Sequence, residues 1–196
     1  DNFNGKLDVK VMDSKVEITT RNNFKNDTAF KYMDYKNLVY KGSTMVQNGK
    51  FSFSFYVPGN ISYSGKAGKM ILYASDSEQK IEAKGNFTNY KVQGTSDDPL
   101  DDHEGPEIVK LYLNDSTFVS GDKVNTTPFF YARLWDQTGV DITEGGVGHD
   151  VMLMIDNKPF TSYNLNSYYN NIFGRKGEGE VRFGIPQLSA GMHEAV

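Results

Sequence analysis

The stretch "NGKFSFSFYVP", residues 48–58, has the most regular alternation of apolar and polar side chains in this chain. Asn48 and Gly49 favour a turn with positive φ at its start. Because successive side chains of an extended strand point to opposite faces, one face would carry Phe51, Phe53, Phe55 and Val57. Three phenylalanines on one face need an opposing layer to cover them, so the stretch predicts a strand in a protein of packed β-sheets.

Similar alternation on either side of this stretch extends the prediction to a whole domain. Further strands are predicted at residues 6–11, 15–20, 69–76 and 79–94. The first two would be joined by a tight turn, with Leu7, Val9 and Val11 on one face of the first strand. Residues 1–93 are therefore expected to form a first β-sandwich of about seven strands.

Residues 94–106, "GTSDDPLDDHEGP", interrupt the alternation and predict a domain boundary. They contain four Asp, one Glu, two Pro and two Gly, and Leu100 is their only large apolar residue. Such a composition is typical of an exposed linker between domains, because it offers little apolar surface to bury.

Alternation resumes after the linker and predicts a second β-sandwich over residues 107–196. Its strands are expected in residues 107–115, 127–136, 149–156 and 179–186. In the first of these, two sets of apolar side chains compete for the inner face. The last stretch, residues 185–196, is typical of a turn followed by the first residues of another strand. The second sandwich is therefore expected to be truncated at its C-terminal strand.

Composition supports an all-β fold of two tandem immunoglobulin-like β-sandwich domains. The chain has 13 Phe, 12 Tyr and 19 Gly but a single Trp, which is the mixture of strand and turn residues that such proteins use. The net charge of -4 is spread out and no Lys/Arg cluster occurs, so nucleic acid is a poor candidate partner. No apolar stretch is long enough to insert into a membrane. With neither a signal peptide nor an initiator Met, the chain is expected to be a piece of a larger protein.

The phrase "GGVGHDVMLMID", residues 145–156, contains a His-Asp pair that admits two interpretations. His149 and Asp150 could be an acid/base pair, but a general base needs a nucleophile or activated water beside it, and no Gly-x-Ser-x-Gly elbow occurs. His103 and His193 are isolated in the sequence. The favoured interpretation is structural: the glycines permit a tight loop, and the pair hydrogen-bonds the backbone before a strand over residues 151–155. No catalytic residue is predicted.

Calcium is the only cofactor for which the sequence offers candidate ligands, because hard cations take several carboxylate oxygens. The candidates lie in the acidic linker and in "DQTGVD" of the second domain: Asp101, Asp102, Glu104 and Asp136. The spacing is not that of an EF-hand, and an acidic run is more often a solvated linker. A chain without a bound metal is therefore the favoured interpretation.

Aromatic and amide side chains alternate in "SYNLNSYYNNIFGRKG", residues 162–177. Exposed aromatic rings could stack on sugars while the amides bind hydroxyl groups. The favoured interpretation is a long loop whose Tyr rings fold onto the edge of the sandwich.

Five segments resemble a known family in the family's own order. They are "VQNGKFSFSFYVPGNISYSGKAGKMILYASD" (46–76), "DDHEGPEIVKLYLND" (101–115), "FVSGDKV" (118–124), "DQTGVDITEGGVGHDVMLMID" (136–156) and "LSAGMHE" (188–194). The last four are similar to the region after the catalytic domain in the PorU family of type IX secretion sortases. The first resembles the sandwich that precedes this region. The family consists of gingipain-like cysteine peptidases of the Bacteroidetes outer membrane.

The resemblance implies a parent enzyme that removes C-terminal secretion signals from cargo proteins and attaches the cargo to an anionic lipopolysaccharide. The family uses a Cys-His pair for this chemistry, and the present chain contains no cysteine. It is therefore expected to be a non-catalytic accessory region, exported to the cell surface or outer membrane. Its expected partners are the catalytic domain of the same parent chain and other type IX secretion components or cargo.

Two other functions stay open at this point. One is a carbohydrate-binding or adhesin-type surface module without an associated peptidase, and the other is an autonomous hydrolase, because a β-sandwich accommodates many functions. The short phrases "DTA" (27–29) and "DST" (115–117) resemble a Bacteroidetes O-glycosylation pattern, with Thr28 and Ser116 as acceptors.

Overall fold

The structure is a computed structural model, and it describes residues 3–21, 28–59, 61–62, 64–94, 96–97, 103–143 and 150–196. Apart from two 3-10 helices, all its regular elements are strands, which confirms the all-β prediction. The strands of the first half are β1 (Gly5–Met12), β2 (Val16–Thr19), β3 (Lys31–Asp34), β4 (Leu38–Val46), β5 (Lys69–Asp76) and β6 (Ile81–Phe87). Those of the second half are β7 (Glu107–Leu113), β8 (Phe129–Trp135), β9 (Met152–Met154), β10 (Ser162–Asn164), β11 (Tyr169–Asn171) and β12 (Glu178–Gly184). The helices are η1 (Pro159–Thr161) and η2 (Asn166–Tyr168).

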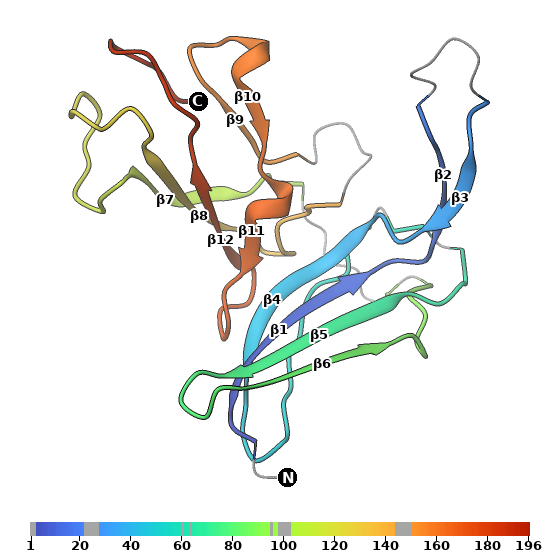
Figure 1. The fold of residues 1–196 in the computed structure, drawn as a ribbon. Coiled ribbons are helices and arrows are strands. Elements are labelled where there is room, and N and C mark those ends of the chain that lie inside the picture. The colour runs from blue at the N-terminus through green and yellow to red at the C-terminus, as the bar shows by residue number, and fades with distance from the viewer. Residues whose placement is uncertain are drawn as a thin grey trace.

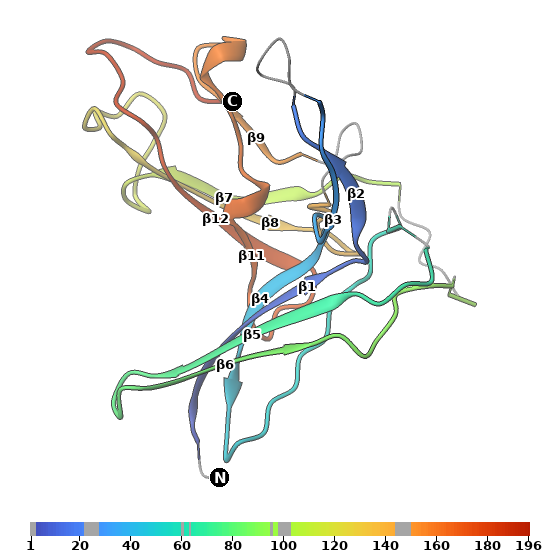
Figure 2. The same ribbon diagram turned by 45° about the vertical axis from the view of Figure 1, so that its right-hand side comes forward.

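Eight strands from both halves form one hydrogen-bonded sheet in the order β6-β5-β1-β4-β11-β12-β8-β7. In Figures 1 and 2, the strands that the first half gives to this sheet, β6, β5, β1 and β4, lie below those of the second half. The strands β2 and β3 project as a separate arm. The two halves meet where β4 and β11 pair in parallel at Gly42 and Asn171. Two side-chain bonds support this junction: the Asn171 amide donates to the Lys41 carbonyl at 3.0 Å, and the Lys41 ammonium donates to the Ser167 carbonyl at 2.7 Å.

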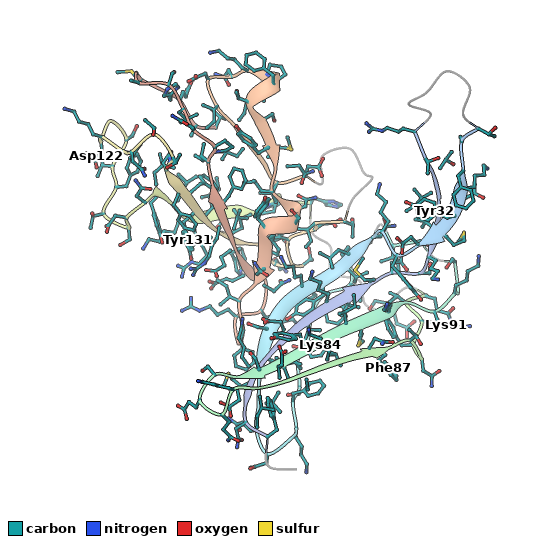
Figure 3. All side chains as sticks on the ribbon, in the orientation of Figure 1. Tyr32, Lys84, Phe87, Lys91, Asp122 and Tyr131 are labelled. Atoms are coloured by element: carbon teal, nitrogen blue, oxygen red, sulfur yellow. The ribbon has the colours of Figure 1, made fainter. Side chains whose placement is uncertain are left out.

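β1 is the central strand of the first half and follows its predicted alternation. Leu7, Val9 and Val11 are 3%, 1% and 0% exposed, so the face that carries them is the buried one. The strand pairs with β4 on one side and β5 on the other, both antiparallel. β5 and β6 lie within their predicted stretches. β6 is the free edge of the sheet, where Figure 3 labels Lys84 and Phe87, and all its residues are exposed.

The predicted tight turn between residues 6–11 and 15–20 is wrong, because β2 pairs with β3 and not with β1. The buried carboxylate of Asp13 accounts for the change of direction. It accepts hydrogen bonds from the backbone N–H groups of Ser14 and Ser62, both at 2.6 Å. Because a buried carboxylate needs such donors, the chain is held here by a residue distant in sequence and leaves the sheet as β2.

The predicted strand at residues 48–58 is half correct. Its three phenylalanines lie on one side and stack in sequence, with ring centroids 6.4 Å apart for Phe51 and Phe53 and 6.1 Å for Phe53 and Phe55. Residues 51–58, however, belong to no ladder. The rings of Phe53 and Phe55 pack instead on Tyr40 of β4, at 5.6 and 4.8 Å, so apolar contact with the sheet replaces backbone pairing beside it. We call residues 51–58 the extended segment.

Each half of the chain has its own cluster of buried apolar side chains. The first core consists of Leu7, Val9, Val11, Val39, Tyr40, Val46 and Ile61. The second core consists of Phe130, Ala132, Leu134, Val140, Ile142, Leu153, Ile155, Leu165, Tyr169, Val181, Phe183 and Ile185. Two cores are what the predicted division into residues 1–93 and 107–196 requires, although a shared sheet also links the halves. Independent folding of the two domains stays a prediction.

In residues 107–115, the sequence left open which of two sets of apolar side chains is buried, and the structure buries neither set fully. Ile108, Val109 and Leu111 are 63%, 43% and 48% exposed, so neither set is fully buried. Leu113 alone packs against the second core. The reason is that β7 is an edge strand, paired only with β8 and with its register shifted between Ile108 and Lys110.

The strand predicted at residues 151–155 is shorter but correctly oriented. β9 covers three residues, and Leu153 and Ile155 are 1% and 2% exposed in the second core, as alternation predicts. The chain's last residues pair with it: Ala195 bridges Ile155, and Met154 and Val196 exchange two backbone hydrogen bonds of 2.8 and 2.9 Å. Among the described residues, no helix is long and apolar enough to cross a membrane.

Candidate functional site

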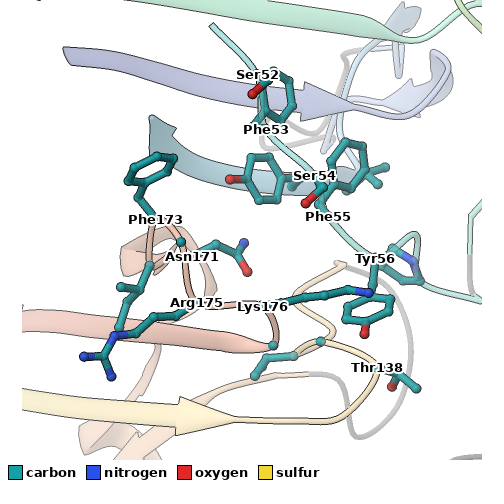
Figure 4. Close-up of a pocket in the computed structure, with 18 residues that line it drawn as sticks. Ser52, Phe53, Ser54, Phe55, Tyr56, Thr138, Asn171, Phe173, Arg175 and Lys176 are labelled. Carbon is teal, nitrogen blue, oxygen red and sulfur yellow. The ribbon is translucent and has the colours of Figure 1, made fainter. Parts of the chain in front are cut away.

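A cavity of about 420 Å³ lies where the two halves of the chain meet, and Figure 4 shows it in close-up. The extended segment provides one wall, and the loop between β11 and β12 provides the wall opposite. The short stretch 138–140 and two residues of β4 complete the lining. The site therefore depends on elements that are more than 100 residues apart in the sequence.

The wall from the first half is aromatic. Phe53 and Phe55 stack on Tyr40, and Tyr56 extends this surface toward the second half. Burial raises the pKa of the Tyr40 phenol, so this ring stays neutral at physiological pH. The wall can therefore offer flat apolar surface, with the hydroxyl groups of Ser52 and Ser54 beside it.

The wall from the second half is cationic. Arg175 and Lys176 line the cavity, and none of the described lining residues is Asp or Glu. The Lys176 ammonium lies 4.1 Å from the centroid of the Tyr56 ring, a distance typical of a cation–π contact. The Arg175 guanidinium lies 3.2 Å from the carboxylate of Glu178, which is not a lining residue. The site therefore favours a ligand that carries negative charge.

Two glycines give the cationic loop its shape. Gly174 and Gly177 have φ angles of 72° and 80°, a region that side chains rarely adopt. A side chain at Gly177 would also overlap the carbonyl oxygen of Asp136, which lies directly against it. The Asp136 N–H donates to the Gly177 carbonyl at 3.0 Å, so the loop is fixed to the end of β8.

The described hydrogen bond of the Asp150 carboxylate is with a side-chain amide and not with the backbone. The Asn166 amide donates to the Asp150 carboxylate at 3.0 Å, and its oxygen accepts the Val151 N–H at 2.8 Å. Asn166 thus joins the start of β9 to η2. His149 lies outside the described residues, so its role stays a prediction.

The calcium candidates are only partly described. Asp101 and Asp102 lie outside the described residues, and Glu104 is exposed. Asp136 is 7% exposed, and one of its carboxylate oxygens accepts hydrogen bonds from the Thr138 N–H at 2.8 Å and the Thr138 hydroxyl at 3.0 Å. Within the described ranges, no group of three or more candidate metal ligands occurs. Calcium binding at the linker stays untested.

His193, which is isolated in the sequence, is paired in the structure. Its Nδ1 lies 2.9 Å from the Asp156 carboxylate, and its Nε2 lies 2.9 Å from the Ser189 carbonyl oxygen and 3.5 Å from the Ser189 hydroxyl. We call Asp156, Ser189 and His193 the C-terminal clasp. No short-range pattern joins Asp156 to residues 37 positions away, so sequence reasoning could not have found it.

The C-terminal clasp has the residue types of a Ser-His-Asp triad but not its arrangement. A general base must offer a lone pair to the serine hydroxyl. Here the nearer partner of Nε2 is a carbonyl oxygen, which only accepts hydrogen bonds, so Nε2 carries a proton. Both ring nitrogens then act as donors, which fits a structural contact between the chain's end and the β9–β10 turn.

Protonation governs the C-terminal clasp. The hydrogen bond to the Ser189 carbonyl, followed by the bond to Asp156, raises the pKa of His193 above its ordinary value of 6.5. The His193 bond, followed by the Glu194 N–H, lowers the pKa of Asp156 below 3.8. The stabilisation that His193 contributes to the folded state is complete below pH 6.5 and is lost as the pH rises through the raised pKa of His193. The stabilisation that Asp156 contributes to the folded state is complete above pH 3.8 and is lost as the pH falls through the lowered pKa of Asp156.

We therefore predict that the chain's last residues are held most firmly between pH 3.8 and 6.5. Amide hydrogen exchange at Met154 and Val196, corrected for the intrinsic effect of pH, should accelerate as the pH rises above this window. His193→Gln should remove this pH dependence, whereas His103→Gln should leave it intact. An acceleration that survives in His193→Gln would show that another group controls it.

The aromatic residues of the stretch 162–177 divide between core and surface. Tyr169 is fully buried in the second core, whereas Tyr168 and Phe173 are 44% and 55% exposed. The predicted long loop is wrong, because the stretch contains β10, η2 and β11, and Tyr169 enters the core as a residue of β11. The two acceptor candidates for glycosylation, Thr28 and Ser116, are both exposed.

Comparison with known proteins gives a similarity to a solved structure. No protein-family model matches the chain, and no curated protein matches it. Among solved structures, the chain is similar to dimeric latent PorU from Porphyromonas gingivalis, with 39% sequence identity and a TM-score of 0.51. The similarity covers 98% of this chain but 18% of that PorU chain. It confirms the family resemblance seen in the sequence and limits it to one region of PorU.

Proposed function

We propose that this chain is the non-catalytic β-sheet region of a type IX secretion sortase like PorU. The observation that carries the proposal is the 39% identity with PorU along 98% of this chain. Because the chain spans 18% of the PorU chain, the activity of the whole protein enters only as a proposal. In this proposal, the chain belongs to a parent cysteine peptidase. The parent removes the C-terminal secretion signal of cargo and attaches the cargo to lipopolysaccharide at the cell surface.

The residues of this chain support an accessory role in that reaction. It has no cysteine to act as the nucleophile, and the nearer partner of the His193 Nε2 in its Ser-His-Asp cluster is the Ser189 carbonyl oxygen and not the Ser189 hydroxyl. Its described surface instead offers contacts. β7 presents Ile108 and Leu111 at an unpaired sheet edge, and exposed apolar residues at such an edge suit packing against another domain.

The test is to charge this edge in the complete parent protein. Ile108→Asp combined with Leu111→Asp should leave cargo with its secretion signal attached, because the edge would no longer hold the catalytic domain or a secretion partner. The control is Val119→Asp, since Val119 is 65% exposed but lies in a loop. The fraction of cargo that retains its signal is measured by mass spectrometry.

Two outcomes would contradict the proposal. The first is a parent gene that encodes no gingipain-like domain with paired His and Cys upstream of Asp1. The second is normal cargo processing by the edge variant at normal abundance of the parent protein, which would show that β7 plays no part in the activity.

A further inference from the structure

The cavity runs along the backbone edge of the extended segment. Five consecutive residues, 52–56, all line it. In an extended chain, successive side chains point to opposite faces, so a cavity lying against one face would contact only alternate residues. A lining of consecutive residues therefore means that the cavity borders the edge at which backbone N–H and C=O groups project. At ~3.3 Å per residue this edge is ~13 Å long, enough for about four residues of another strand.

This backbone edge has unused hydrogen-bonding capacity. Within the described part of the chain, the extended segment makes no backbone–backbone hydrogen bond. Its one backbone group with a described partner is the Ser52 carbonyl, which accepts the Thr44 hydroxyl at 3.0 Å. Extended backbone with free donors and acceptors is a template for an added strand, and many peptide-binding domains use such a template.

The opposite wall determines what charge the added strand should carry. The Lys176 side chain is exposed, and its ammonium lies 4.1 Å from the centroid of the Tyr56 ring. Arg175 also lines the cavity, but its guanidinium is already paired with the Glu178 carboxylate at 3.2 Å. An acidic ligand would therefore meet the Lys176 ammonium, and none of the described lining residues is an anion that competes for it.

We propose that the cavity binds an extended acidic peptide, which adds as a β-strand along the extended segment and places a carboxylate beside Lys176. The rings of Phe53 and Phe55 provide apolar contact for alternate side chains of the peptide. The proposal does not depend on the proposed role in a sortase, because the site lies entirely within this chain.

The probe is a blocked, fluorescently labelled octapeptide in which valine and glutamate alternate. One comparison peptide replaces glutamate with lysine, and another replaces the two central valines with proline, which cannot donate to a ladder. We expect the acidic peptide to bind at least about tenfold more tightly than either, and its affinity to fall as salt rises. Hydrogen exchange should show new protection at the amides of residues 53–57.

Lys176→Gln should weaken binding of the acidic peptide about tenfold, because it removes one charge-assisted contact. The matched control is Lys123→Gln, an exposed lysine in a loop that does not line the cavity. Equal binding of the proline peptide, or no new protection at residues 53–57, would overturn strand addition. Equal binding of the lysine peptide would overturn the charge selection. Binding of neutral oligosaccharides in place of peptide would identify the site as a glycan site.

Discussion

Leu165→Ala is expected to lower the free energy of unfolding of the second half by about 3 kcal/mol. Leu165 is completely buried in the second core, so the shorter side chain leaves a cavity that its neighbours cannot fill. The single Trp of the chain, Trp135, lies in β8 of the same half. Its fluorescence therefore reports when this half unfolds, and the denaturation midpoint measured by it should fall.

Leu7→Ala is the companion experiment in the first core. Leu7 is 3% exposed, so the loss in that half should be similar, about 3 kcal/mol. If residues 1–93 and 107–196 fold as separate domains, Leu7→Ala should leave the denaturation midpoint measured by Trp135 fluorescence unchanged. The unfolding of the first half should then appear as an earlier transition in the circular dichroism of the whole chain. A Trp135 midpoint that falls equally in both variants would show one cooperative unit joined through β4 and β11.

The matched control for both variants is Leu111→Ala. It removes the same atoms from a side chain that is 48% exposed on β7. A surface truncation of this kind changes stability by no more than about 0.5 kcal/mol. A loss in Leu111→Ala as large as in Leu165→Ala would show that burial is not the cause.

Gly179→Ala is expected to destabilise the second half by about 3 kcal/mol through overpacking. A Cβ atom at Gly179 would overlap the ring of Tyr169, which pairs with Val181 across β11 and β12 and is itself completely buried. The ring cannot move aside without opening the core. The φ angle of Gly179 is not positive, so the effect would come from steric overlap and not from backbone strain.

Gly184→Ala, in the same strand, is the control for this overlap. No atom lies within 4 Å of the position that its Cβ would occupy, and its φ angle is not positive either. Its midpoint by Trp135 fluorescence should therefore match that of the unmodified chain. If Gly179→Ala were equally harmless, the close packing of Tyr169 against β12 would be contradicted.

How far the sequence could predict this fold is clearest in the stretch 48–58. Alternation correctly placed Phe51, Phe53 and Phe55 on one side, because that periodicity is a local property of extended chain. Whether extended chain pairs with a neighbour depends on residues far away. Here the rings of Phe53 and Phe55 stack on the ring of Tyr40, and the ladder that the alternation predicted does not form.

The candidate site shows the same division. The sequence indicated the stretch 162–177 for its aromatic and amide side chains, but it could not place Arg175 and Lys176 of this stretch opposite Phe53. It likewise left His193 without a partner, although Asp156 lies 2.9 Å away in the structure.

By itself, the sequence determined the all-β class, the inward faces of β1 and β9, the absence of a cysteine nucleophile and the resemblance to PorU. These features follow from residue type and from the two-residue period of a strand, which need no knowledge of distant neighbours. The tertiary structure alone decided that both halves share one sheet, that the extended segment keeps an unpaired backbone edge, and that two cations lie across a cavity from it. The shared sheet and the cavity depend on contacts between residues more than 100 positions apart, and the pairing of those residues is fixed only when the chain is folded.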